Sequence, residues 1–137
     1  MVVSSTNSQY AANLIRDANL KAKLTSPTLN REELDQLAEQ LIASAVGNRP
    51  PLNSGWTNSP YSISKLFLNC LVRIVSKEEE TTRRNILINA CCPGLCKTRM
   101  GGSHATKDAS HGARLPLVLA TLPNSPFAPN GNYFSDS

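Results

Sequence analysis

A tyrosine and a lysine that can act together in acid catalysis lie four residues apart, at Tyr61 and Lys65. In a helix this spacing places both side chains on one face, one turn apart. An ammonium group close to a phenol favours the phenolate form, so the phenol becomes a workable proton donor and acceptor nearer to neutral pH. The pair therefore predicts general acid catalysis.

The segment that carries this pair has the pattern of a strong helix. Ser59 is a suitable N-cap, and Pro60 is suited to the first helical position because its missing N–H is unpaired there in any case. One side of the helix is apolar through Ile63, Leu66, Phe67, Cys70, Leu71 and Ile74, and a second side through Leu68, Val72 and Val75. One side can pack on a sheet, and we expect the helical segment 9–46 of the same chain to cover the other.

Two apolar segments predict strands that end beside the catalytic pair. Residues 1–3 form a short apolar run that ends at Ser4 and Ser5. Residues 85–92 are mostly apolar without strict alternation, as in a strand buried on both faces of a parallel sheet, and a Pro-Gly pair ends them. The carboxyl ends of parallel strands meet at one edge of a sheet, where ligands bind.

The remaining segments predict helices and a last strand. Residues 9–24 are weakly helical and end at Ser26-Pro27. A better helix starts with a capping box formed by Asn30 and Glu33 and ends at Gly47. Its inward face consists of Leu34, Leu37, Ala38, Leu41 and Ala45. The loop that follows, over 48–59, has Trp56 as its large apolar anchor.

Residues 107–122 predict another helix, with Pro116 in its early turns, and residues 132–135 predict a short final strand. The inward face of this helix is expected to consist of Ala113, Leu117, Val118 and Leu122. Strands therefore alternate with helices along the chain, which predicts a doubly wound α/β fold with a parallel sheet.

Three segments taken in order resemble the short-chain dehydrogenase/reductase family. They are Val-Ser-Ser at 3–5, Tyr-Ser-Ile-Ser-Lys at 61–65, and Asn-Ala-Cys-Cys-Pro-Gly-Leu-Cys-Lys-Thr at 89–98. The last of these, together with Gly55-Trp56 and the long insertion before the tyrosine, resembles the monomeric, cytosolic NADPH-dependent carbonyl reductases in particular. The resemblance implies one partial domain over 1–137, the C-terminal half of a Rossmann-type sheet with a helical insertion at about 9–46.

The resemblance also implies a role for each site residue. Tyr61 would donate a proton to the substrate carbonyl, Lys65 would make that phenol more acidic and hold the nicotinamide ribose, and Ser5 would orient the carbonyl. The family places its catalytic serine second in such a pair, so Ser5 is preferred to Ser4. The nicotinamide side would be lined by Pro93, Gly94, Leu95, Cys96 and Thr98, with Thr98 donating to the carboxamide or a phosphate.

The substrate would be a small carbonyl compound, namely a ketone, an aldehyde or a quinone, that is reduced to an alcohol. It would contact Ser5, Tyr61 and Trp56, next to the loop at 100–106. The insertion would cover the tyrosine-bearing helix, which predicts a monomer. A protein of this kind would be cytoplasmic.

The glycine-rich phosphate loop of the family does not occur in this sequence. There is no Gly-x-x-x-Gly-x-Gly and no Asn-Asn-Ala-Gly segment, and Val2 stands where relatives usually carry asparagine. We therefore expect the N-terminal cofactor-binding half to be absent, and NADPH rests on the resemblance alone. Two hypotheses stay open. The sequence is either a part of an NADPH-dependent carbonyl reductase, or a truncated, inactive fragment that cannot bind cofactor.

The composition argues against other classes of function. The net charge of +4 comes from scattered residues without a basic stripe, so nucleic-acid binding is not expected. No apolar run is long enough to span a membrane, and the first residues lack the features of a signal peptide. Four cysteines without such a signal indicate reduced thiols. Zinc ligands would have to come from Cys91, Cys92, Cys96, His104 and His111, which lack the paired spacing of zinc sites, so no metal is predicted.

Overall fold

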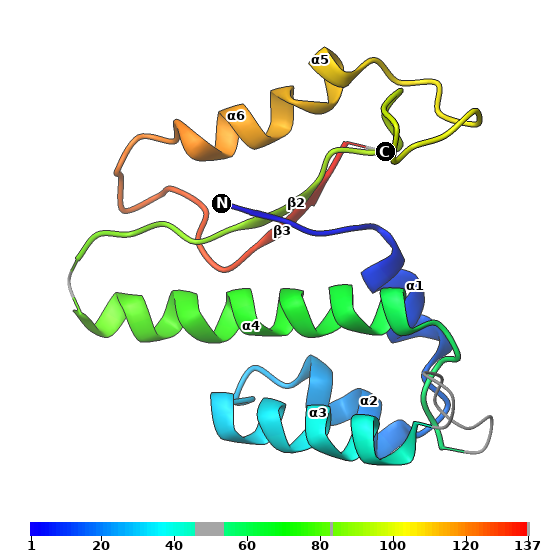
Figure 1. The fold of residues 1–137 in the computed structure, drawn as a ribbon. Helices are drawn as coiled ribbons and strands as arrows, with labels where there is room; N and C mark the ends of the chain where they lie inside the picture. The colour runs from blue at the N-terminus through cyan, green and yellow to red at the C-terminus, as the bar shows by residue number, and fades with distance from the viewer. Residues whose placement is uncertain (46–53, 83, 137) are drawn as a thin grey trace.

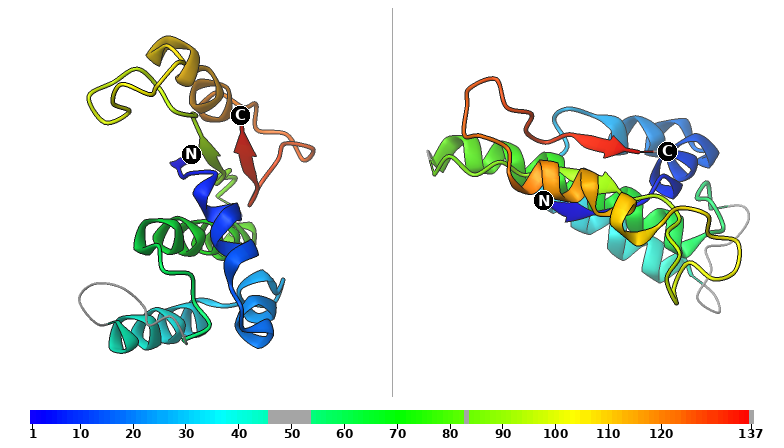
Figure 2. Two further views of the ribbon diagram at one scale, coloured as in Figure 1. Left: turned by 90° about the vertical axis from the view of Figure 1, so that its right-hand side faces the viewer. Right: turned by 90° about the horizontal axis from the view of Figure 1, so that it is seen from above.

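The computed structural model describes residues 1–45, 54–82 and 84–136. A three-stranded sheet lies between two helical layers (Figure 1). Helices α5 (Ala109–Gly112) and α6 (Arg114–Ala120) lie on one face of the sheet, and the long helix α4 (Pro60–Thr82) lies on the other. The views of Figure 2 show a further helical layer beyond α4, on the side away from the sheet.

The sheet is entirely parallel, with strand order β1-β2-β3. Its strands are β1 (Val2–Val3), β2 (Ala90–Cys92) and β3 (Tyr133–Ser135). Val3 lies opposite Cys91, and Cys91 lies opposite Phe134. All three residues of β2 are buried, as a strand covered by helices on both faces requires. The predicted doubly wound parallel fold is confirmed.

The central strand is shorter than the predicted segment 85–92, because only Ala90–Cys92 finds strand partners. The backbone before it is satisfied by a loop instead: the Ile88 N–H donates to Asn130 Oδ1 at 2.8 Å, and the Gly131 N–H donates to the Ile88 carbonyl at 2.8 Å. Asn85 has a φ of 55°, which turns the chain away from an extended path. The predicted length was therefore wrong.

Helix α4 begins as predicted. The Ser62 N–H donates to Ser59 Oγ at 3.3 Å, which makes Ser59 the N-cap, and Pro60 is the first helical residue. The buried residues of α4 are Ser62, Ile63, Leu66, Cys70, Val72, Ile74 and Ser76. They lie on more than one side of the helix, so α4 is covered by both of its neighbouring layers.

The segment predicted as one helix over 9–24 forms two, α1 (Asn7–Leu14) and α2 (Ala18–Thr25). The break is fixed by Asp17, whose carboxylate accepts from the N–H groups of Asn19 and Leu20 and so starts a new helix. The buried Ile15 takes an extended conformation at the end of α1. The segment is helical as predicted, but the internal aspartate caps a second helix, so 9–24 is not one continuous helix.

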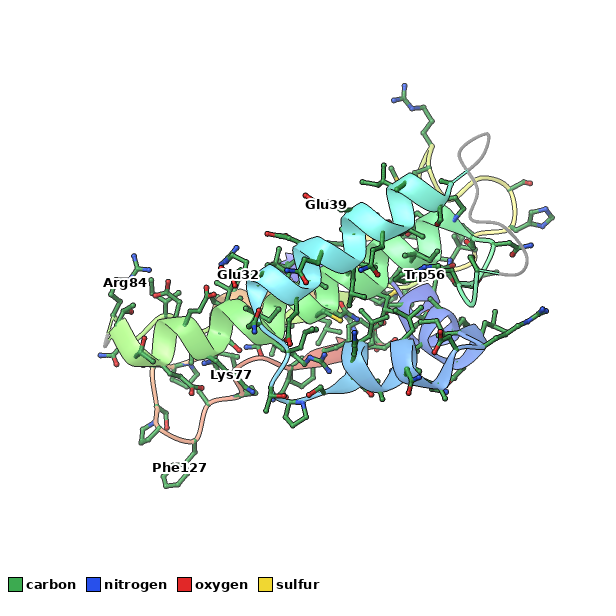
Figure 3. All side chains as sticks on the ribbon, turned by 90° about the horizontal axis from the view of Figure 1, so that it is seen from below. Glu32, Glu39, Trp56, Lys77, Arg84 and Phe127 are labelled. Carbon is green, nitrogen blue, oxygen red and sulfur yellow. The ribbon has the colours of Figure 1, made fainter. Side chains whose placement is uncertain are left out.

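Helix α3 (Arg31–Ser44) has the predicted capping box, with Asn30 and Glu33 each accepting from the other's backbone N–H. Leu34 and Leu37 of its predicted inward face are 5% exposed. Glu32 and Glu39 lie on the outer face of this helix (Figure 3). The predicted stop at Gly47 lies outside the described residues.

Helices α1, α2 and α3 all pack against α4. A shared cluster of buried side chains joins the four helices: Ala11, Ile15, Leu20, Leu24, Leu29, Leu34, Leu37, Trp56, Ile63, Leu66, Cys70 and Ile74. The expectation that the segment 9–46 covers the second side of the tyrosine-bearing helix is confirmed for its described residues.

The C-terminal helix also differs from its prediction. Residues 107–122 form the separate helices α5 and α6, with Pro116 in the first turn of α6 as predicted. Leu119 is the buried residue of α6, whereas Leu117 and Val118 are 64% and 56% exposed. Each helical residue is rotated by about 100° from the one before, so with Leu119 facing β2 the predicted residues point elsewhere. The predicted inward face was wrong.

Candidate active site

The tyrosine and the lysine lie together at the start of α4. Lys65 Nζ is 5.8 Å from the centroid of the Tyr61 ring. Tyr61 is 54% exposed, so a ligand can reach the phenol from solvent. The predicted placement of the two side chains one helical turn apart on one face is therefore confirmed.

Lys65 also joins α4 to the end of β1. Its ammonium group donates to the Val3 carbonyl at 3.3 Å, and Ser4 Oγ donates to the Lys65 carbonyl at 3.4 Å. An ammonium has three donors, so Val3 uses one and leaves two N–H groups for other acceptors. The lysine is thus held at the carboxyl end of a parallel strand, where doubly wound folds bind their ligands.

Ser5 follows β1 and is 9% exposed. Its Oγ accepts from the Asn7 N–H at 3.2 Å, which leaves the hydroxyl proton free to be donated. Ser4, in contrast, uses its hydroxyl on the backbone of α4. The described residues show no hydrogen bond between Ser5 and Tyr61, so what links the two is their shared position around Lys65 and the end of β1.

The loop after β2 forms a second wall at this edge of the sheet. Gly94 has a φ of 78°, and a Cβ there would lie 2.7 Å from Lys107 Nζ, so the position suits only glycine. Cys96 forms a parallel bridge with Lys107, and the Lys97 N–H donates to the Lys107 carbonyl at 2.8 Å. The start of the loop is therefore held against Lys107, two residues before α5.

Two residues of this loop differ in what they offer a ligand. Leu95 is 56% exposed and presents an apolar surface. Thr98 donates its hydroxyl proton to the Cys96 carbonyl at 3.3 Å and accepts from the Gly101 N–H at 3.2 Å. Thr98 must therefore give up a turn contact before it can donate to a cofactor, as its predicted role requires.

Lys107 holds the loop after β2 in place, a structural role that the sequence did not reveal. Its ammonium group donates to the Asp136 carbonyl at 2.8 Å and contacts Asp136 Oδ2 at 3.2 Å, while its stem packs on Gly94. It thereby ties the loop after β2 to the end of β3. Nothing in its spacing marks it, because its partners lie far away in the sequence.

Trp56 lies in the core. It is 7% exposed and stacks on Phe67, with ring centroids 5.8 Å apart. It therefore has little surface left for the substrate contact predicted for it, and its position supports the start of α4 instead. Met100, at the predicted substrate loop, is 98% exposed.

The thiols near the sheet are free and shielded from water. Burial raises the pKa of Cys91, and the neighbouring Cys92 adds to that shift. Burial also raises the pKa of Tyr133, on β3, to about 12. Within the described ranges, His, Cys, Asp and Glu side chains do not gather in groups of three that could hold a metal ion, and no helix there is long and apolar enough to cross a membrane.

Comparisons with known proteins give a consistent result. The chain is 38% identical over 119 residues to carbonyl reductase [NADPH] 1 of Rattus norvegicus. The matched region covers 85% of this chain and 43% of the relative. The chain is 35% identical over 136 residues to carbonyl reductase [NADPH] 1 of Sus scrofa, covering 98% and 46%. Carbonyl reductase [NADPH] 3 of Homo sapiens is 35% identical over 120 residues. No family model matches the chain.

Among solved structures, salutaridine reductase from Papaver somniferum matches with a TM-score of 0.74 and 24% identity. The match covers 98% of this chain and 44% of that structure, and at this identity it shows the fold. The chain therefore spans slightly less than half the length of the proteins it matches.

Proposed function

Because this chain belongs to the short-chain dehydrogenase/reductase family, as a C-terminal region of the carbonyl reductase type, we propose that it carries the catalytic residues for NADPH-dependent reduction of carbonyl compounds. The observation that carries the proposal is the position of Lys65, whose ammonium group lies between the Tyr61 ring and the carboxyl end of β1. Relatives named as carbonyl reductases [NADPH] support the reaction type.

In this proposal Tyr61 is the proton donor. Its exposed side chain can meet a carbonyl oxygen that arrives from solvent, and the ammonium group of Lys65 lies beside its ring. The Ser5 hydroxyl, which is free to donate, forms a hydrogen bond to the same carbonyl oxygen and orients it. As the carbonyl is reduced, charge develops on this oxygen, and both hydroxyl groups would stabilise it.

The residues present fit one end of a dinucleotide. Lys65 keeps two donors for ribose hydroxyls, and Gly94 lets the backbone after β2 approach a flat ring closely. With Pro93, Leu95 and Cys96, this loop would form the nicotinamide side of the site. NADPH, when bound, would supply the hydride. The phosphate-binding glycine loop has no counterpart in this sequence.

We further propose small ketones, aldehydes or quinones as the substrates, with the loop at 100–106 beside them, and a cytoplasmic monomer as the working form. The exposed apolar surface of Leu95 and Met100 suits the apolar part of such a compound. Trp56 is left out of the proposed pocket because it is buried against Phe67.

The substitution Tyr61→Phe tests the proposal in the complete encoded protein. It removes the hydroxyl that gives the proton and keeps the ring beside Lys65, so NADPH-dependent quinone reduction should fall by a factor of about one hundred or more. The binding of NADPH, followed by its fluorescence, should stay similar. The reaction rate is read from the loss of NADPH absorbance.

Tyr10→Phe is the matched control, since Tyr10 is a tyrosine on α1 that is 63% exposed, and it should keep full activity. Retention of most activity by Tyr61→Phe would remove Tyr61 from its proposed role. A complete protein that neither binds NADPH nor reduces any quinone would instead favour the inactive-fragment hypothesis.

A further inference from the structure

A second polar side chain of α4, one helical turn beyond Lys65, reaches the first turn of α1. Asn69 Nδ2 donates to Ser8 Oγ at 2.8 Å. Ser8 lies in the first turn of α1 and is 1% exposed, and its Oγ donates to the Ser5 carbonyl at 2.7 Å. A continuous chain of two hydrogen bonds therefore runs from α4 to the backbone of the proposed catalytic serine.

The direction of this chain is fixed by the number of protons. A serine hydroxyl has one proton, and Ser8 uses it on the Ser5 carbonyl. Asn69 must therefore present its amide N–H to Ser8, and its Oδ1 faces the other way. That oxygen is buried without a hydrogen-bond partner among the described residues, beside a pocket of about 220 Å³ between α1, α4 and β3. This orientation leaves a buried acceptor unpaired, which costs free energy, while the amide gains the hydrogen bond to Ser8.

The contacts restrain the turn that carries the serine. The Ser5 carbonyl accepts from both the backbone N–H of Ser8, at 3.0 Å, and its hydroxyl, at 2.7 Å. The Ser5 hydroxyl in turn accepts from the Asn7 N–H at 3.2 Å. Rotation of the turn would break all three contacts, so the direction of the free hydroxyl proton depends on Ser8 and, through it, on Asn69.

We propose that Asn69 and Ser8 are positioning residues that hold Ser5 in register with the Tyr61–Lys65 pair. This inference rests on the proposed function of that pair. Tyr61, Lys65 and Asn69 follow one another at four-residue intervals along α4, so one helix places the proton donor, its cation and the anchor of the serine turn. Small errors in such placement reduce the rate of the chemical step more than they reduce binding.

Kinetics of Ser8→Ala and Asn69→Leu in the complete encoded protein test the role in catalysis. Both variants should lower kcat roughly tenfold, and the KM for NADPH should stay within about twofold, because neither residue belongs to the proposed cofactor contacts. Ser76→Ala is the matched control: Ser76 is also a buried serine, 3% exposed, and its hydroxyl donates only within α4, to the Arg73 carbonyl. Equal kcat in Ser8→Ala and Ser76→Ala would overturn the proposal.

Amide hydrogen exchange gives a readout that does not need activity. The backbone N–H groups of Asn7 and residue 8, which close the turn, should exchange roughly tenfold faster in Ser8→Ala and Asn69→Leu than in Ser76→Ala. Unchanged exchange at these two amides would refute the positioning role even if Tyr61→Phe behaves as proposed. Faster exchange together with an active Tyr61→Phe variant would refute the function proposed for Tyr61 and leave the restraint of the turn in place.

Discussion

At the scale of single residues, Lys65 joins the parts of the candidate site. Its ammonium group contacts the Val3 carbonyl and lies near the Tyr61 ring, and its own carbonyl accepts from Ser4. A strand end and a helix start are thereby joined through one side chain. A small movement of α4 would shift the proposed proton donor and its cation together, which keeps their mutual distance constant.

Tyr133 gives a pH-dependent prediction. Burial raises the pKa of this phenol from its usual value of 10.0 to about 12 in the folded state, with the nearby Cys92 adding to the effect. The unfolded chain releases the proton near the usual value, whereas the folded chain still holds it. The stability that the neutral phenol supports is therefore complete below about pH 10 and declines as the pH rises toward about 12.

Urea unfolding at a series of alkaline pH values measures this decline. Tyr133→Phe cannot ionise, so its free energy of unfolding should fall less steeply than that of the unchanged protein between these two pH values. Tyr10→Phe, at an exposed position, should follow the unchanged protein. If the free energies of unfolding of Tyr133→Phe and the unchanged protein fell in parallel with pH, the pKa of Tyr133 would not be raised by folding.

The residues of the site could be predicted to the extent that their contacts are local. The Tyr61–Lys65 pair follows from the helical period, and the end of an apolar run indicates Ser4 and Ser5, between which the family resemblance favours Ser5. Lys107 could not be found, since its contacts with Gly94 and Asp136 depend on how three separate segments pack. Trp56 looked like a pocket residue in a loop, and its burial depends on the stacking of Phe67 from another segment.

At the scale of elements, the loop after β2 is set by Gly94. Its φ of 78° is costly for any residue with a Cβ, and an added methyl group would also displace Lys107 from Asp136. Gly94→Ala should therefore destabilise the protein by about 1–2 kcal/mol. It should also weaken NADPH binding, because this loop forms the proposed nicotinamide side.

Gly102→Ala separates the cost of an alanine at positive φ from the effect of disturbing the loop after β2. Gly102 has a φ of 65°, but a Cβ there would meet nothing within 4 Å. It should show a similar loss of stability in thermal or urea unfolding without the loss of NADPH binding. Equal NADPH affinity in both variants would remove the loop after β2 from the proposed cofactor site.

Element boundaries were predictable where a local signal sets them. The capping box of α3 and the Ser-Pro start of α4 are examples, since each depends on residues three or fewer apart. The extent of β2 was not predictable, because a strand lasts only as long as its neighbours, and β1 has two residues and β3 three. The buried face of α6 also depends on where the sheet lies.

At the scale of the whole molecule, the layers of the fold explain where the insertion lies. Helix α4 has one side on the sheet, and α1, α2 and α3 cover its other side (Figures 1 and 2). The charged outer face of α3, with Glu32 and Glu39, forms the surface of that layer, while Phe127 stands exposed on the loop between α6 and β3 (Figure 3). The covering helices thus replace an apolar helix face with a polar one.

The final prediction concerns the oligomeric state. A homodimer through the covered side of α4 would need α3 to leave it, which would expose Leu34 and Leu37, each 5% exposed in the fold. Burying each of these side chains is worth about 1.5–3 kcal/mol, so the covered state should persist and the complete encoded protein should be a monomer. Light scattering coupled to size-exclusion chromatography measures this mass directly.

Leu37→Ser should loosen this cover, lower the stability by about 2–4 kcal/mol and increase self-association, because the apolar side of α4 then becomes available to another copy. Ile42→Ser, on the same helix but 72% exposed, should change neither stability nor mass. A stable dimer of the unchanged protein that Leu37→Ser does not affect would mean that association uses another surface and that the cover of α4 does not determine the oligomeric state.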